Sequence, residues 1–255
     1  MTTVLVTGGN RGIGLGLVKE LLKNPEVGTL FATTRDVSRS KDFTSITDPR
    51  LKVVKMDAAC DDSILSTVKT VKEQLDQKGL DLLINNSGVL HPVQMNGPLD
   101  RKSALANFEV NAVGALMVTQ AFIPLLRDAA KQRGSAQIVS ISSFLASLEN
   151  AYGSTPRGFL AYSMSKTAVN QMTRSLAIDL KADNIYVTSI DPGYVKTDMG
   201  TDDAHITVSN IPPSVYSKNY DWSTSLHRIW QKTIMILGKE HNGGFYDYKL
   251  QMHAF

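Results

Sequence analysis

The sequence contains a single cysteine, Cys60, in 255 residues. One cysteine cannot form an internal disulfide, which excludes the disulfide-stapled scaffolds of small secreted proteins and favours a reducing compartment. We therefore expect a cytoplasmic protein in which Cys60 is a small structural residue near the end of a strand and not a nucleophile.

Long apolar runs are also absent. A membrane-spanning helix needs about 20 consecutive apolar residues, and the most hydrophobic segment, 115–126, is interrupted by Thr119, Gln120 and Pro124. A strand-like apolar segment begins almost at Met1, where a secreted or imported chain would carry a leader peptide. We expect neither a targeting segment nor a membrane partner.

Charge of one sign is not concentrated anywhere in the chain. The net charge is +3, and Lys and Arg do not form a block, so nucleic acid is not an expected partner. The five histidines, at 91, 205, 227, 241 and 253, lack the spacing of metal ligands. We interpret them as surface or loop residues and expect no metal.

The hydrophobic pattern that is present alternates between strand-like and helix-like segments. It predicts strands at 3–7, 28–33, 51–56, 80–85, 136–142, 185–190 and 244–247. It predicts helices at 12–24, 61–78, 101–131 and 160–182, and a less regular one at 222–237. This alternation favours an α/β fold with a doubly wound parallel sheet and helices on both faces. No linker-like stretch divides the chain, so we expect a single domain over 1–255.

The first predicted strand leads into a glycine-rich turn, Gly8-Gly9-Asn10-Arg11-Gly12-Ile13-Gly14, which opens a helix. A strand, a glycine turn and a helix in this order are the context of a phosphate-binding loop. Gly8 allows the tight turn, while Gly12 and Gly14 let backbone N–H groups approach a pyrophosphate at the positive end of the helix. A P-loop nucleotidase is excluded, because Leu15-Gly16 stands where that class requires Lys-Ser/Thr.

Tyr162 and Lys166 are four residues apart in a predicted helix, which places a phenol and an ammonium group on the same face. A free tyrosine has a pKa near ~10, and a neighbouring cation lowers it by favouring the phenolate. The pair therefore predicts acid–base chemistry near neutral pH.

The Thr-Gly-x-x-x-Gly-x-Gly spacing from Thr7 and the Tyr162–Lys166 pair together resemble the short-chain dehydrogenase/reductase family. Further landmarks follow in that family's order: Asn85-Asn86-Ser87-Gly88, Asn111, the strand with Ser140, Ser142 and Ser143, and the turn 191–197. Within the family the chain most resembles sniffer-type carbonyl reductases, in Asn10-Arg11-Gly12, 192–200 and 242–245. The resemblance implies a Rossmann-like fold, with 1–90 mainly binding cofactor and 91–255 carrying catalysis and substrate binding.

The resemblance implies catalytic roles for Ser143, Tyr162, Lys166 and Asn111. Tyr162 would donate a proton to the substrate oxygen and Ser143 would hold that oxygen, with Ser142 as the alternative serine. Lys166 would bind the nicotinamide ribose and lower the pKa of Tyr162, and Asn111 would extend a proton relay through water.

Cofactor choice depends on Arg35, which stands at the end of the second predicted strand, where NAD sites carry an acid. A cation there favours the 2′-phosphate of NADP(H), with Arg11 and Arg39 as further candidates. The alternative is a solvated Arg35 paired with Asp36. The full expected cofactor set is Gly8, Asn10, Arg11, Gly12, Ile13, Gly14, Arg35, Asp57, Ala58, Asn86, Gly88, Tyr162, Lys166, Pro192, Gly193, Val195 and Thr197.

These residues predict an NADPH-dependent reductase of a ketone, quinone or aldehyde. An NAD(P)-dependent secondary-alcohol dehydrogenase and a dinucleotide-binding redox sensor with little turnover remain alternatives. The segment 201–230 is expected to cover the active site, but its pattern does not identify the substrate. Helices 101–131 and 160–182 match those that pair in dimeric relatives, so we expect a homodimer, with a monomer as the alternative.

Overall fold

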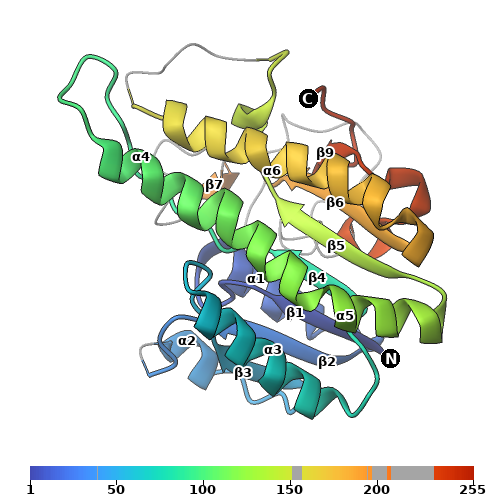
Figure 1. Ribbon diagram of the computed structural model, residues 1–255. Coiled ribbons are helices and arrows are strands. Elements are labelled where there is room, and N and C mark those ends of the chain that lie inside the picture. Colours follow the sequence, from blue (N-terminus) through green and yellow to red (C-terminus); the bar gives the residue numbers. More distant parts are fainter. Residues whose placement is uncertain (39, 151–156, 194, 197–205, 208–232) are drawn as a thin grey trace.

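A computed structural model describes residues 1–255 apart from 39, 151–156, 194, 197–205 and 208–232 (Figure 1). Its centre is a seven-stranded parallel sheet with the order β3-β2-β1-β4-β5-β6-β9. The strands are β1 (Thr2–Val6), β2 (Val27–Thr34), β3 (Leu51–Lys55), β4 (Leu82–Asn85), β5 (Ala136–Ile141), β6 (Ile185–Asp191) and β9 (Phe245–Asp247). The chain starts in the middle of the sheet, runs to one edge and returns past β1 to the other edge, so the predicted doubly wound sheet is confirmed.

The α-helices are α1 (Gly12–Leu21), α2 (Lys41–Thr44), α3 (Asp61–Leu75), α4 (Arg101–Phe108), α5 (Ala115–Arg133) and α6 (Leu160–Asp179). Shorter 3-10 turns occur at η2 (Phe144–Ala146), η3 (Lys181–Asp183) and η5 (Lys239–His241). The sequence did not predict α2 or the small pair β7 (Val195–Lys196) and β8 (Ile206–Thr207). Of the predicted helix at 222–237, residues 233–236 are helical, and 222–232 lie outside the described residues. The expected active-site cover at 201–230 also lies outside them, apart from β8.

Helices cover both faces of the sheet, as the alternating pattern requires. In Figure 1, α3, α5 and α6 lie on the near face, and α1 lies on the opposite side. Each face of the sheet has its own hydrophobic core, and successive side chains along β1 point into alternate cores. Leu5 belongs to the core that contains Phe122 of α5, whereas Val4 and Val6 belong to the core that contains Leu17 of α1. The carboxyl ends of β1, β2, β4 and β5 therefore meet at one edge, between the two helical layers.

The long predicted helix at 101–131 is interrupted by a π-helical turn, η1 (Glu109–Gly114), between α4 and α5. Such turns insert a residue into the helical register and occur frequently at functional sites. The sequence did not predict this one. It carries Asn111, a buried residue whose side chain forms hydrogen bonds with Val89 and Ser165.

Among the described residues, one helical stretch, Arg101–Arg133, is long and apolar enough to cross a membrane, with a mean hydropathy of 1.4 in its best window. Of that window, 44% is buried inside the fold. The stretch is weak evidence for a membrane span, because a core helix passes the same test of length and hydropathy.

Candidate active site

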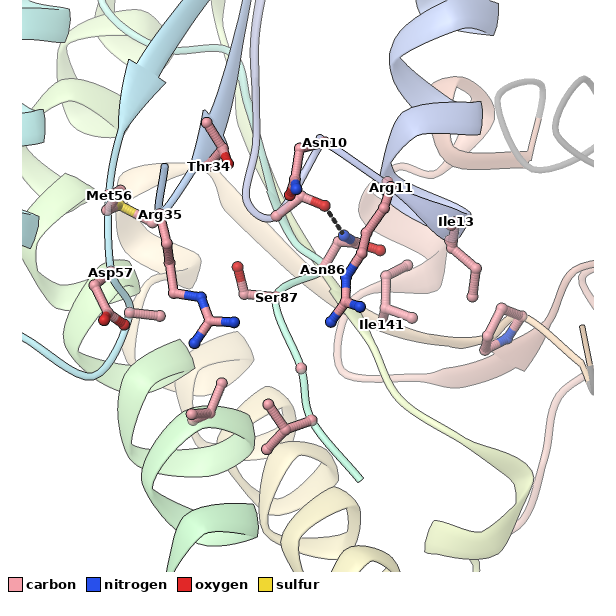
Figure 2. A pocket seen from close by; sticks show the side chains of 18 of the residues that line it. Asn10, Arg11, Ile13, Thr34, Arg35, Met56, Asp57, Asn86, Ser87 and Ile141 are labelled. Atoms are coloured by element: carbon pink, nitrogen blue, oxygen red, sulfur yellow. Dashed lines mark hydrogen bonds between the residues drawn. The ribbon is translucent and has the colours of Figure 1, made fainter. Parts of the chain in front are cut away.

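A cavity of about 560 Å³ opens at the carboxyl ends of the strands, where the glycine turn, the end of β2 and the segment after β4 converge (Figure 2). Its volume lies within the usual range of cofactor pockets, about 300–1,000 Å³. Predicted residues that line it are Gly8, Asn10, Arg11, Gly12, Ile13, Gly14, Arg35, Asp57, Ala58, Asn86, Gly88, Tyr162, Lys166 and Pro192.

The glycine turn is packed so closely that side chains are excluded. Gly8 has a positive φ of 63°, and a Cβ on Gly14 would collide with the carbonyl oxygen of Gly8. Asn86 holds the turn in place, since its Nδ2 donates to the carbonyls of Thr7 at 2.8 Å and Gly8 at 3.1 Å. Asn86 therefore both lines the cavity and fixes the loop.

The N-terminus of α1 suits an anion. Within the described residues, no side chain caps this end of α1, and its first turn contains no acidic residue. Its backbone N–H groups and the positive end of the helix dipole therefore face the cavity without a competing carboxylate. This end of the cavity fits a pyrophosphate.

Two arginines extend toward the cavity from different elements. Figure 2 shows the guanidinium groups of Arg35, after β2, and Arg11, before α1, both reaching into it. The carboxylate of Asp36 accepts from the backbone N–H of Ser38 at 2.9 Å and from its hydroxyl at 2.6 Å. Among the described residues no ion pair involves Arg35, so the alternative pairing with Asp36 is not formed. Arg39 lies outside the described residues.

Asp57 and Ala58 follow β3 and line the cavity, and Figure 2 shows Asp57 beside Arg35. The backbone N–H of Asp57 donates to the Ser63 hydroxyl at 2.9 Å, and its side chain accepts from the N–H of Ala59 at 3.0 Å. These bonds fix the turn and leave the carboxylate at the cavity edge. It can therefore accept a further hydrogen bond from a ligand amino group.

Tyr162 and Lys166 lie buried at the opposite end of the cavity, on α6. Lys166 Nζ donates to the carbonyl of Ile141 at 2.7 Å and lies 5.8 Å from the centroid of the Tyr162 ring. Burial lowers the pKa of Lys166 to about 8 and raises the pKa of Tyr162 to about 12, although the Ser143 hydroxyl opposes that rise. Burial is the largest effect on the pKa of Tyr162, so the net shift is upward, and the expectation that Lys166 lowers this pKa stays a prediction. At neutral pH the phenol therefore keeps its proton and has one to donate.

The two candidate serines have different surroundings. The hydroxyl of Ser142 donates to Asn170 Oδ1 at 2.7 Å, so it is committed to α6 although Ser142 lines the cavity. The hydroxyl of Ser143 accepts from the N–H of Leu145 at 3.2 Å and lowers the pKa of Tyr162. This arrangement favours Ser143 as the partner of the phenol.

Asn111 connects the π-helical turn to the wall of the cavity. Its Oδ1 accepts from the N–H of Val89 at 2.8 Å, and its Nδ2 donates to the Val89 carbonyl at 2.9 Å and to Ser165 Oγ at 3.0 Å. A Cβ on Gly88 would lie 3.2 Å from Asn111 Oδ1 and 3.6 Å from Lys166 Nζ, so Gly88 separates these two polar groups. Ser165 was not predicted, and its position next to Lys166 is its only signal in the sequence.

The predicted turn after β6 is only partly described. Pro192 lines the cavity, and the N–H of Gly193 donates to Asp191 Oδ1 at 3.1 Å. Val195 begins β7, and Thr197 lies outside the described residues. Among the described residues no group of three potential metal ligands occurs.

A family model described as short chain dehydrogenase matches residues 2–206. An uncharacterized oxidoreductase of Schizosaccharomyces pombe is 31% identical over 250 residues, covering 95% of this chain and 94% of the relative. The chain belongs to the short-chain dehydrogenase family. Families of this kind bind a nicotinamide dinucleotide and act on carbonyl or alcohol groups, so this protein is an oxidoreductase with a small-molecule substrate.

Two solved structures resemble this short-chain dehydrogenase over its whole length. The carbonyl reductase Sniffer of D. melanogaster is 32% identical with a TM-score of 0.87, covering 100% of both chains. An NADPH-bound carbonyl reductase from chicken fatty liver is 29% identical with a TM-score of 0.87, covering 100% of this chain and 94% of that one. The predicted resemblance to sniffer-type carbonyl reductases is confirmed.

Several residues around the short-chain dehydrogenase cavity were missed from the sequence. They are Thr34, Asp36, Ser40, Met56, Ser87, Val89, Val110 and Ile141. Most of them are next to predicted residues in the sequence. Their position at or just after the end of a strand was the only feature of the sequence that could have indicated them. Val110 could not be found in this way, because it reaches the cavity from the π-helical turn.

Proposed function

We propose that this short-chain dehydrogenase is an NADPH-dependent carbonyl reductase that acts on a ketone, quinone or aldehyde. The observation that carries the proposal is the buried, protonated Tyr162 beside Lys166 and Ser143, at the end of the cavity that begins at the glycine turn. NADPH, when bound, supplies the hydride for the carbonyl carbon. The protein must then supply a proton to the carbonyl oxygen and stabilise the charge that develops there.

The residues divide this work. The Tyr162 hydroxyl donates the proton, and the Ser143 hydroxyl donates a hydrogen bond to the same oxygen. Lys166, still largely protonated at pH 7 because its pKa is about 8, places a positive charge behind the phenol and offsets the phenolate that forms. Asn111, whose amide donates to the Val89 carbonyl and to the Ser165 hydroxyl, would extend a proton relay from Lys166 through water.

The preference for NADP(H) is supported by Arg35 and Arg11, which point into the same part of the cavity (Figure 2). A 2′-phosphate there would accept charge-assisted hydrogen bonds from both guanidinium groups. Asp57 and Ala58 would lie against the adenine, and Pro192, Gly193, Val195 and Thr197 would seat the nicotinamide.

The test is oxidation of NADPH, followed by its absorbance, with a panel containing a quinone, an isatin and an aromatic aldehyde. Replacing Tyr162 by Phe removes only the proton donor, and kcat should fall about 10²–10⁴-fold, the usual contribution of a general acid. NADPH binding should persist in this variant. Equal turnover by the wild type and Tyr162→Phe would refute the assignment.

The alternatives give different outcomes in the same assay. An alcohol dehydrogenase would turn over secondary alcohols with NADP⁺ or NAD⁺ faster than it reduces any carbonyl of the panel. A redox sensor would bind the dinucleotide with little turnover in either direction. The complete set Ser143, Tyr162, Lys166 and Asn111 favours a catalyst, because a sensor has no need of a proton donor.

We also propose a cytoplasmic, single-domain homodimer. Large apolar side chains are exposed on α4, α5 and α6 and on the π-helical turn η1 between α4 and α5. They are Leu105, Val113, Leu116, Leu160 and Met164. Since α4 and α6 lie side by side (Figure 1), these side chains offer a surface for a second copy. Light scattering of the wild type and of Met164→Glu tests this, and a monomer in both cases would refute it.

A further inference from the structure

His253 lies in a loop after β9, as the sequence allowed, but its side chain is not at the surface. Only 19% of its side chain is exposed. Its ring packs between Phe245 of β9, with the centroids 4.9 Å apart, and Phe144, at 5.5 Å in an edge-to-face arrangement. Its backbone N–H donates to the carbonyl of Phe245 at 2.7 Å. The ring is therefore fixed in place by β9 and by the residue that directly follows Ser143.

The imidazole faces a buried carboxylate next to the catalytic end of the cavity. His253 Nε2 lies 3.5 Å from Asp191 Oδ2, and 10% of the Asp191 side chain is exposed. At this distance the two groups form an ion pair when His253 is protonated, and not a short hydrogen bond. The other oxygen, Oδ1, accepts from the N–H of Gly193 at 3.1 Å. Asp191 thus links His253 to the turn whose Pro192 lines the cavity.

The charge of Asp191 acts on the proposed proton donor. Its carboxylate contributes to raising the pKa of Tyr162 above the ordinary value. A negative charge here also opposes the charge that develops on the substrate oxygen. An unpaired buried carboxylate would therefore hinder the reaction as well as cost folding free energy.

The groups around His253 favour its protonated form. Asp191 raises the pKa of His253, burial opposes the rise, and Asp247 on β9 adds to it. Arg174 on α6 is engaged elsewhere, against the Phe255 ring at 5.3 Å and the Gly243 carbonyl at 3.2 Å. Glu149, after η2, is exposed, and its backbone N–H donates to the Phe255 carbonyl.

We propose that His253 is a positioning residue for carbonyl reduction. As an imidazolium it neutralises the carboxylate of Asp191, the residue that holds the Gly193 turn. This neutralisation allows Tyr162 to donate its proton. This role rests on the proposed function. When His253 loses its proton, the Asp191 carboxylate is left without its counter-charge beside Tyr162. Because the folded pKa of His253 lies above 6.5, the rate of reduction should fall as the pH rises through that raised value.

The pair can be tested without turnover, by following the NMR signals of ¹³C-labelled histidines against pH. Replacing Asp191 by Asn removes the charge and keeps an oxygen for the Gly193 N–H. In Asp191→Asn the His253 titration should move down toward about 6.5, the ordinary value, while the other histidines serve as internal controls. An unchanged His253 titration would overturn the pair.

Kinetics test the role in catalysis. In His253→Gln, kcat below the His253 titration should fall about tenfold, the effect of one pKa unit on the strength of an acid, and the pH dependence assigned to His253 should vanish. His241→Gln is the matched control, because His241 lies beside the exposed Glu240 at 3.4 Å, and it should keep the wild-type profile.

A double variant separates charge compensation from packing. His253→Gln combined with Asp191→Asn should recover most of the lost rate, since no charge remains to be neutralised. A double variant as slow as His253→Gln, or a wild-type pH profile in His253→Gln, would overturn the role. If the wild type reduces no carbonyl at all, the proposed function fails and the catalytic role with it, and the NMR titration then shows separately whether the ion pair exists.

Discussion

Arg35 decides between NADPH and NADH, because it is the cation that ends β2 and points into the cavity (Figure 2). Replacing it by alanine removes its hydrogen bonds to a 2′-phosphate. A hydrogen bond to a charged group contributes about 1.5–3 kcal/mol, and each 1.4 kcal/mol is about tenfold in Kd. Since Arg35 is exposed, we expect the lower part of that range, a weakening of NADPH binding of about 10- to 30-fold.

Fluorescence titration of NADPH and NADH measures both affinities. NADH lacks the phosphate, so its Kd should change little in Arg35→Ala. Arg127→Ala is the matched control, because Arg127 forms a surface ion pair with Asp183 at 2.8 Å on the opposite end of the domain from the glycine turn.

The salt dependence adds a second readout. Exposed charges are screened with a Debye length of about 10 Å at 0.1 M salt, so the difference between wild type and Arg35→Ala should shrink as the ionic strength rises. Equal weakening of NADPH and NADH, or tighter binding of NADH than NADPH by the wild type, would refute the assignment of Arg35.

Three further predictions concern the loop and the buried polar residues. Lys166→Met should abolish turnover. It should also raise the free energy of unfolding by up to about 3 kcal/mol at pH 7, because the lowered pKa of about 8 reflects the cost of burying the ammonium. In denaturant titrations this gain in stability should decline from pH 8 and vanish above about pH 10.5, where the lysine of the unfolded chain is also neutral. Gly14→Ala should destabilise the fold by about 1–3 kcal/mol or displace the turn at Gly8, seen as a lower Tm and lost cofactor binding. Ser143→Ala should lower kcat about 10²–10³-fold with little change in Tm, whereas Ser142→Ala should lower the stability by about 1–3 kcal/mol and leave kcat nearly unchanged.

The parts of the fold that follow local rules could be predicted from the sequence. All seven strands of the main sheet were predicted to within a few residues, because buried parallel strands are short apolar runs bounded by turns. The glycine turn was also predictable, since its spacing has a direct steric meaning that the collision at Gly14 shows.

The π-helical turn was not predictable, because its cause is not local. The insertion of one residue between α4 and α5 shifts the helical register, yet the hydrophobic pattern across 101–131 still resembles one continuous helix. Asn111 reaches Val89 and Ser165 only because of tertiary packing. Single-sequence periodicity contains no signal for such a turn.

His253 shows a second kind of limit. It is separated by 62 positions from Asp191, and His253 itself belongs to no motif. Their pairing depends on a bridge between Tyr246 and Met252 that folds the last residues of the sequence back along β9. Solvent exposure was the natural expectation for an isolated histidine, and the structure corrects it.

The same burial explains why charges distant from the reacting atoms matter here. Burial, with a contribution from the Asp191 charge, raises the pKa of Tyr162 to about 12, above the range in which a phenol is an effective acid at neutral pH. Among the described residues, groups that favour the phenolate, as the Lys166 ammonium also would, or that cancel a negative charge beside it can recover acid strength. Ser143 acts in the first way and His253, through Asp191, in the second. A protein that buries its proton donor must therefore control the charges around the phenol, and that control extends from β6 to the residues that follow β9.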